Sequence, residues 1–193
     1  MRAPWLTVPP VLCSILTSPR TDIFQIRHTM LKTSPEELIT RLALQPHPEG
    51  GHFRETYRSQ ERVTRSHGDS TRSAATAIYY LLRGKERSTW HRIESDEMWH
   101  FYAGAPLHVY VLQPEGEVRV LRLGNPLEHD GTDFQALVPA GAWFAAECSV
   151  PDGYSLVGCT VAPGFEFDEF EIAQADVLLS DWPKHRELIE RLA

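Results

Sequence analysis

Cysteine is scarce in this chain of 193 residues, which contains only Cys13, Cys148 and Cys159. An odd, sparse set does not form a disulfide framework, and no pair has the C-x-x-C spacing of a metal site. Cys148 and Cys159 lie in apolar runs, where a buried and inert thiol is the usual role. The cysteine content therefore argues against a disulfide-stabilised secreted domain and indicates a reducing, cytoplasmic compartment.

An excess of positive charge is also missing, because 26 acidic residues outnumber 19 Lys and Arg and give a formal charge of −7. Nucleic-acid-binding domains need a clustered basic face, so binding to DNA or RNA is not expected. A local run of Arg54, Arg58, Arg62 and Arg65 is interpreted as a solvated loop and edge strand. The alternative is that one of them, Arg54 above all, points at an anionic ligand.

No apolar segment reaches the ~20 residues that a membrane-spanning helix needs, so no membrane partner is expected. The moderately apolar residues 5–16 are interrupted by Pro9 and Pro10. Residues 1–30 hold four of the fourteen prolines and show no helical period. We predict that they form a disordered extension outside the fold. A weak organelle-targeting segment is the alternative, since such presequences are poor in acidic residues.

Residues 31–193 have the pattern of one all-β domain with a short helix at each end. Ser34-Pro35-Glu36-Glu37 is typical of a capped helix start, and the amphipathic residues 182–193 predict a closing helix. Between them, nine short runs alternate apolar and polar residues with a period of two. The predicted strands are residues 52–59, 74–82, 88–93, 97–103, 107–112, 118–123, 134–138, 143–148 and 154–161. Nine strands without intervening helices favour a sandwich or a barrel.

Two stretches are predicted to lie outside the strands. Residues 60–72 are polar and irregular and predict a mobile loop that can lie over a barrel mouth. Residues 165–171 mix acidic side chains with phenylalanines at 165, 167 and 170. We interpret them as a solvated stretch that covers the outside of the barrel, and not as a cation site.

The central stretch of the chain is TWHRIESDEMWHFYAG, residues 89–104, which contains two strands joined by the polar residues 94–96. Side chains alternate along a strand, so His91 points to one face of the first strand and Glu97 to one face of the second. In a tight antiparallel hairpin the two would meet with Cβ atoms ~5–8 Å apart. We therefore predict an imidazole–carboxylate pair within hydrogen-bond reach. A buried ion pair with a purely structural role is the alternative.

The spacing of His91, Glu97 and Gly104 resembles the first sequence motif of the cupin superfamily, and residues 139–144, PAGAWF, resemble the second. Ile93 and Phe144 stand where that family has its second and third histidines. The HPEGG sequence at 47–51, the WHRIESDEMWH run and PGF at 163–165 are similar to a functionally uncharacterised cupin branch. The resemblance covers residues 31–193 and implies a double-stranded β-helix, or jelly roll.

The resemblance also implies a homodimer. Jelly rolls leave edge strands that must be covered. The first predicted strand, residues 52–59, is the expected interface, because its Phe53 and Tyr57 lie close to an open edge.

Three functions remain open, and the first is slightly favoured. It is metal-independent isomerase, epimerase or lyase chemistry on a sugar-like or nucleotide-like ligand, with His91, Glu97 and Tyr79 as catalytic candidates. Tyr79 or its neighbour Tyr80 would supply a proton, and a core or wall aromatic is the alternative role for either residue. The sugar-nucleotide epimerases of the RmlC type, themselves cupins, use a histidine base without a metal, and the resemblance implies the same for this chain.

The second function is a non-catalytic binding or sensing module for a small molecule. Aromatic walls and a few polar groups are typical of such pockets. The ligand-binding candidates for either function are Arg54, Trp99, Tyr110, Trp143 and Phe144.

The third function is a metal-dependent enzyme, although no cofactor is expected. A catalytic metal site needs three protein ligands and an open position. His91 and Glu97 would supply two ligands, and His52, His100 or His108 would supply the third.

Overall fold

The computed structural model describes residues 33–65 and 70–193. The predicted disordered extension, residues 1–30, lies outside the described residues, as does part of the loop predicted at 60–72. The described chain begins with helix α1, Pro35–Arg41, whose N-cap is Ser34. The Ser34 hydroxyl accepts a hydrogen bond from the Glu37 backbone N–H at 3.1 Å, which confirms the predicted helix start.

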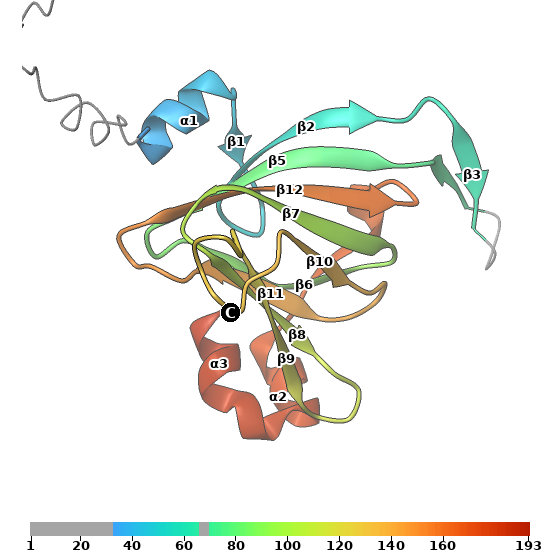
Figure 1. Cartoon of the computed structure of the whole chain (residues 1–193). Helices are drawn as coiled ribbons and strands as arrows, with labels where there is room; N and C mark the ends of the chain where they lie inside the picture. Colours follow the sequence, from blue (N-terminus) through green and yellow to red (C-terminus); the bar gives the residue numbers. More distant parts are fainter. Residues whose placement is uncertain (1–32, 66–69) are drawn as a thin grey trace, which may run out of the picture. The chain divides into compact units, whose positions relative to one another are not determined.

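Two larger antiparallel sheets form the jelly roll that the sequence predicts (Figure 1). The first sheet has the order β1-β2-β5-β12-β7-β10, and the second has the order β13-β6-β11-β8-β9. The strands of the first sheet are Gln45–Pro46 (β1), His52–Arg58 (β2), Thr76–Arg83 (β5), Asp96–Gly104 (β7), Gln135–Val138 (β10) and Tyr154–Ala162 (β12). The strands of the second sheet are Arg87–Ile93 (β6), Leu107–Leu112 (β8), Val118–Leu123 (β9), Phe144–Cys148 (β11) and Phe170–Ile172 (β13).

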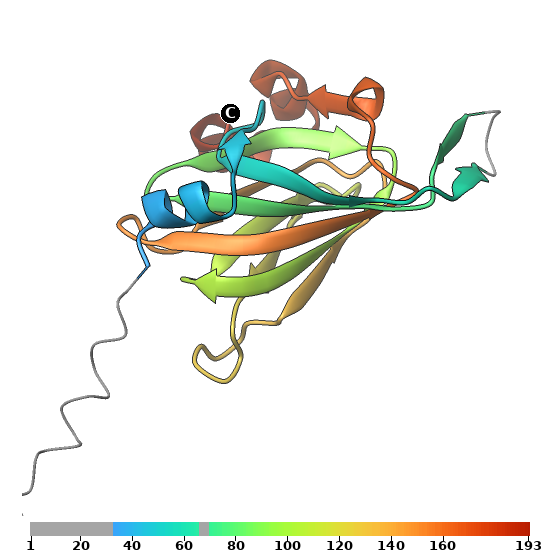
Figure 2. The same ribbon diagram turned by 90° about the horizontal axis from the view of Figure 1, so that it is seen from above.

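A separate two-stranded hairpin extends from the first sheet. It consists of β3, Arg62–Thr64, and β4, Thr71–Ser73, and it projects away from the barrel in both views (Figures 1 and 2). These strands occupy part of the region predicted as an irregular loop. In this hairpin Arg62, Val63 and Thr64 pair in antiparallel register with residues 71–73.

The core lies between the two sheets and consists of side chains that point inward from both. Its largest fully buried members are Tyr80, Trp99 and Phe144. Burial of such aromatic side chains dominates the stability of a core of this kind. The alternation of the strands therefore sets which residues can reach the interior and which face outward.

Helices cover the outer faces of both sheets. Helix α1 packs with Leu81 and Leu156 on the first sheet. Helices α2, Ala175–Asp181, and α3, Arg186–Arg191, lie together near the second sheet (Figure 1). They pack against Trp90 of that sheet and bury it. The predicted closing helix is thus shorter than residues 182–193, because the 3₁₀ turn Pro183–His185 precedes α3. Among the helices of the described residues, none is long and apolar enough to cross a membrane.

Candidate functional site

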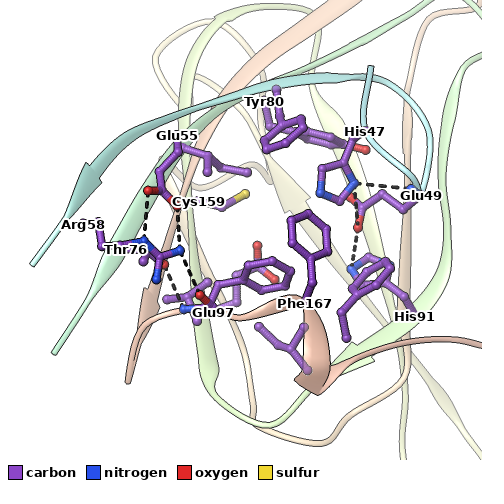
Figure 3. Close-up of a pocket in the computed structure, with 16 residues that line it drawn as sticks. His47, Glu49, Glu55, Arg58, Thr76, Tyr80, His91, Glu97, Cys159 and Phe167 are labelled. Carbon is purple, nitrogen blue, oxygen red and sulfur yellow. Dashed lines mark hydrogen bonds and ion pairs between the residues drawn. The ribbon is translucent and has the colours of Figure 1, made fainter. Parts of the chain in front are cut away.

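One cavity of about 70 Å³ lies between the sheets, beneath the segment that follows Pro163 (Figure 3). Its polar lining comes from five strands and from the loop between β1 and β2. These polar residues are His47, Glu49, Glu55, Arg58, Thr76, Tyr80, His91, Glu97 and Cys159. The apolar lining residues are Phe53, Ile78, Ile93, Val161, Phe165, Phe167 and Phe170. The cavity therefore combines ionisable groups with an aromatic cover.

His91 is buried on β6 and is held in one orientation by its own strand. Its Nδ1 lies 2.7 Å from the carbonyl oxygen of Thr89. A carbonyl oxygen only accepts hydrogen bonds, so Nδ1 must carry a proton. The other ring nitrogen, Nε2, is therefore left facing the carboxylate of Glu49, with 3.1 Å between Nε2 and Oε2.

Glu49 is the carboxylate that pairs with His91, and three neighbours fix its position. Its Oε1 accepts a hydrogen bond of 3.0 Å from the Ser88 hydroxyl. Its backbone carbonyl accepts a hydrogen bond of 2.9 Å from the Thr89 N–H. Oε2 also lies 3.5 Å from Nδ1 of His47, so a single carboxylate oxygen contacts two imidazole rings.

The double glycine of the HPEGG sequence brings Glu49 into this position. Gly50 has a φ of 110°, and a Cβ atom there would lie 2.1 Å from the Arg87 carbonyl oxygen. Only glycine permits both the left-handed backbone and this close approach. The Tyr80 hydroxyl donates a 2.8 Å hydrogen bond to the Gly50 carbonyl and holds the turn from inside the barrel.

His47 is a neutral imidazole in this arrangement. Burial lowers the pKa of His47 most, the negative charge of Glu49 raises it, and the neighbouring His91 lowers it. Its Nδ1 accepts a hydrogen bond of 3.3 Å from the backbone N–H of Glu49. An unprotonated Nδ1 is consistent with both observations.

The predicted hairpin contact between His91 and Glu97 is wrong in its geometry, although both side chains line the cavity. Strand β6 belongs to the second sheet and β7 to the first, so the turn after Ile93 carries the chain from one sheet to the other. His91 and Glu97 therefore face the cavity from different sheets. Among the described residues, the carboxylate within ion-pair distance of His91 is that of Glu49.

Glu97 is a buried carboxyl group with 7% of its surface exposed. Burial raises its pKa to about 8, with a further increase from the negative charge of Glu49. Hydrogen bonding to the Cys159 thiol acts weakly in the opposite direction. Glu97 therefore keeps its proton at neutral pH. Burial also raises the pKa of the Cys159 thiol well above its ordinary value, which agrees with the inert thiol expected from the sequence.

The structure places four other predicted site residues outside the cavity. Tyr79 points away from the interior, where Arg54 lies 5.6 Å over its ring and both stand on the outer face of the first sheet. Tyr110 and Trp143 pack against the C-terminal helices on the outer face of the second sheet. Strand alternation explains this result, because the residue next to an outward side chain points inward, as Tyr80 does beside Tyr79.

Arg58 lines the cavity in place of Arg54. Phe53 and Glu55 of β2 also line it, so odd-numbered residues point inward at the start of the strand. The pairing of β2 with β5 shifts between Glu55 and Tyr57. Such a bulge changes which residues face inward, and it turns Arg58 toward the cavity. This shift could not be read from the sequence.

Trp99 and Phe144 lie in the core below the cavity. Phe144 packs against His91 with 4.0 Å between ring centroids, and Trp99 lies edge-on to Phe144 at 6.3 Å. The exposed fraction of each of these two residues is 1% or less. They support the His91 ring from beneath and leave the cavity walls to other residues.

The three histidines predicted as alternative metal ligands do not come together with His91. His52 lies 3.8 Å from Glu86, His100 contacts Thr160 and Gln135, and His108 lies near Tyr110. These three predicted alternatives thus stand away from His91. In residues 33–65 and 70–193 there is no group of three or more His, Cys, Asp or Glu that could hold a metal ion. The Phe144 ring packs against His91 where the cupin motif would supply another histidine.

The segment after Pro163 covers the cavity, which corrects the prediction that it lies on the outside of the barrel. Phe165, Phe167 and Phe170 contact one another edge to face, at 5.0–6.3 Å between ring centroids. The acidic residues between them pair with arginines of β2 and the β3–β4 hairpin. These ion pairs are Arg58–Glu166 at 2.7 Å, Arg65–Glu169 at 2.6 Å, Arg72–Asp168 at 3.2 Å and Arg72–Glu169.

His47, Glu49 and Arg58 line the cavity although none of them is among the site residues that the sequence predicts. Of the two tyrosines considered as proton donors, it is Tyr80 and not Tyr79 that faces the cavity. The signal for Glu49 was the HPEGG sequence itself, in which an acidic residue precedes two glycines. A carboxylate beside a backbone that approaches another strand closely is well placed to reach across that strand.

Comparison with known proteins supports the same fold. The family model described as "Cupin superfamily (DUF985)" matches residues 36–173, which is more than half of the chain. Protein YML079W of Saccharomyces cerevisiae, described as uncharacterized, is 29% identical over 150 residues, covering 71% of this chain and 74% of that protein.

Two solved structures are similar over most of the described chain. Protein SO0799 from Shewanella oneidensis has a TM-score of 0.74 and 41% identity, covering 82% of this chain and 96% of that one. A hypothetical protein from Leishmania major has a TM-score of 0.76 and 35% identity, covering 83% and 98%. The jelly roll, the two cupin motifs and the family match agree, and the chain belongs to the cupin superfamily, in the family DUF985.

Proposed function

We propose that this protein is a metal-independent proton-transfer enzyme, an isomerase, epimerase or lyase, that acts on a small molecule in the barrel. The observation that carries the proposal is the 3.1 Å contact between Glu49 Oε2 and His91 Nε2 at the cavity wall. Since His91 Nδ1 donates to the Thr89 carbonyl, Nε2 is the ring nitrogen that can exchange a proton with the carboxylate or with a ligand. This pair can release a proton or take one up.

Glu97 supports the proposal because it faces the same cavity in its protonated form. A protonated carboxyl group that faces the same cavity as an imidazole–carboxylate pair is typical of an acid–base site. Glu49 and His91 would remove a proton from a carbon atom of the ligand, while Glu97 would donate a hydrogen bond or a proton to another atom. Return of the proton to carbon completes an isomerisation or epimerisation and consumes no oxidant or reductant.

The proposal assigns different roles from those expected from the sequence. His91 keeps its role, Glu49 replaces Glu97 as its partner, and Glu97 becomes the acid. Tyr80 becomes a positioning residue, because its hydroxyl holds the Gly50 carbonyl of the loop that carries Glu49.

Deuterium exchange tests this function directly. The protein is incubated in D₂O with a panel of aldoses, ketoses and cyclic ketones, and replacement of C–H by C–D is followed by NMR. We expect exchange with at least one compound, and Glu49→Gln and His91→Asn should each slow it by about 100-fold or more. Tyr79→Phe is the matched control, since Tyr79 lies on the outer face of the sheet, and it should exchange at the wild-type rate.

A non-catalytic binding module is the second candidate, and the phenylalanine-rich cover of the cavity favours it. The same experiment separates the two. Saturable binding of a compound without any deuterium uptake above the protein-free rate supports the binding module and contradicts the enzyme.

A further inference from the structure

Glu97 faces the cavity and has no strong hydrogen-bond partner among the described residues. The residue is more than nine-tenths buried. Its only polar neighbour acting on it by hydrogen bonding is the Cys159 thiol, which is a weak donor. Across the described residues, no oxygen, nitrogen or backbone group hydrogen bonds to its carboxyl group. A buried carboxyl group without a strong partner costs free energy, which a ligand can recover by accepting a hydrogen bond from it.

The charged side chains that line the cavity already form ion pairs with other side chains of the protein. Arg58 donates to Glu55 at 2.8 and 3.0 Å and to Glu166 at 2.7 Å. Glu49 is paired with His91. A charged ligand would therefore enter a largely apolar site without a free counter-charge, and burial of an unpaired charge is strongly unfavourable.

The remaining walls favour a compact ring. Phe167 and His47 lie with their ring planes 28° apart and their centroids separated by 6.2 Å (Figure 3). Phe165 completes the apolar side. The cavity of about 70 Å³ limits the ligand to a small molecule.

From these observations we infer that the ligand is a compact, uncharged carbonyl compound whose oxygen accepts a hydrogen bond from Glu97 and whose ring lies against Phe165 and Phe167. The inference rests on the proposed function for its chemistry, because a carbonyl group acidifies the neighbouring C–H. The inference narrows the class of sugar-like or nucleotide-like ligands that the sequence suggests. Phosphorylated members of that class are disfavoured because they are charged.

Acetophenone and benzoate test the inference as a pair, because they have similar shapes and differ in charge. Both are titrated against protein carrying ¹³C-labelled isoleucine methyl groups at pH 6.5, and Ile78 and Ile93 report on the cavity. We expect acetophenone to shift both signals saturably, with at least tenfold higher affinity than benzoate. Equal or tighter binding of benzoate, or no shift with 20 mM acetophenone, overturns the inference.

Two substitutions test the role of Glu97. Glu97→Gln keeps a neutral hydrogen-bond donor, so acetophenone affinity should stay within threefold of wild type. Glu97→Leu removes the donor and should weaken acetophenone at least tenfold. Unchanged affinity in Glu97→Leu would show that Glu97 does not bind the carbonyl oxygen.

The wild-type protein provides a measurement that needs no variant. Glu97 ionises near pH 8 and then loses its donor, so acetophenone affinity should fall between pH 7 and 9. The other ionisable groups facing the cavity are Glu49, Glu55, Arg58, His47, His91, Tyr80 and Cys159. In Glu97→Gln the affinity for acetophenone should not change between pH 7 and 9. If the affinity still falls in that variant, one of these other groups causes the pH dependence, which contradicts the role of Glu97.

The two proposals fail in different ways. Tight acetophenone binding without deuterium exchange at its methyl group, or at any compound of the panel, contradicts proton transfer and leaves the ligand class intact. Exchange in an anionic compound, together with no preference for acetophenone over benzoate, contradicts the ligand class and leaves proton transfer intact.

Discussion

Glu49 and His91 meet at 3.1 Å across the boundary between the β1–β2 loop and strand β6. The contact exists because the loop crosses over β6, where the Gly50 backbone passes close to the Arg87 carbonyl. Ser88 and Thr89 then hold the carboxylate and the ring from the same strand. One short stretch of β6 thus positions both members of the pair.

Loss of the Glu49 carboxylate should be costly to stability. Glu49→Ala leaves the buried Ser88 hydroxyl and the His91 ring without their acceptor, so we expect the free energy of unfolding to fall by about 3–5 kcal/mol. Urea unfolding at pH 7 measures this. Arg41→Ala removes one partner of an exposed ion pair and is the control, with an expected change below about 1 kcal/mol. A similar small loss in Glu49→Ala would show that the buried pair is not coupled to folding.

Glu97 should make stability depend on pH in a defined direction. Its pKa is about 8 in the folded protein, against 4.5 without burial. Between these pH values the folded chain keeps a proton that the unfolded chain has released, so this contribution to stability is complete below pH 4.5 and declines as the pH rises to 8. Relative to wild type, Glu97→Gln should therefore gain about 3–5 kcal/mol between pH 5 and pH 9, since one pKa unit corresponds to about 1.4 kcal/mol.

Urea unfolding of both proteins at pH 5 and pH 9 gives this difference. The exposed Glu37→Gln serves as the control and should stay within about 0.5 kcal/mol of wild type at both pH values. A Glu97→Gln difference that is the same at both pH values would show that Glu97 titrates normally in the folded protein.

Tyr80 and Tyr79 should respond differently to loss of the hydroxyl group. Tyr80→Phe leaves the Gly50 carbonyl without its donor, and we expect a loss of about 1–2 kcal/mol in unfolding free energy. Tyr79→Phe alters only the outer face and should change stability by less than about 0.5 kcal/mol. If the two variants unfold at the same urea concentration, the Tyr80 hydrogen bond does not stabilise the loop.

The ion pairs that hold the phenylalanine segment should be stronger than ordinary surface pairs. The Arg65 and Glu169 side chains are only 15% and 10% exposed, whereas Arg186 and Glu190 are 62% and 53% exposed. A double-mutant cycle to alanine should give a coupling energy of about 1.5–3 kcal/mol for the first pair and below about 0.5 kcal/mol for the second. Equal coupling energies would mean that the Arg65–Glu169 pair stabilises the segment no more than an ordinary surface pair does.

Self-association through β2 remains a prediction. Strand β1 pairs with β2 at His52 and Phe53, and within residues 33–65 and 70–193 no strand pairs with the rest of that edge. Tyr57 on this edge is 54% exposed. We expect sedimentation equilibrium at micromolar concentration to give the mass of two chains, and Tyr57→Asp to shift the protein toward monomer. A wild-type mass of one chain would refute the homodimer.

The strands of the jelly roll could be predicted from local sequence patterns, and the resemblance to the cupin motifs supplied their arrangement. All nine predicted runs contain a strand, because period-two alternation of apolar residues is a local property that each segment carries. The capped start of α1 is local in the same sense, since Ser34 and Glu37 interact within one turn. The spacing of His91 and Glu97 likewise placed both on strands that line the cavity.

Which side chains come into contact depends on the tertiary structure. Glu49 reaches His91, and Arg58 replaces Arg54 at the cavity, because of a close loop approach and a shift in strand pairing that depend on the neighbouring strands. The chain also changes sheets between β6 and β7, so His91 and Glu97 are not cross-strand neighbours. Periodicity fixes the face of a side chain within its own strand. Its partner is fixed by how the strands are arranged around the barrel, which is a property of the whole fold.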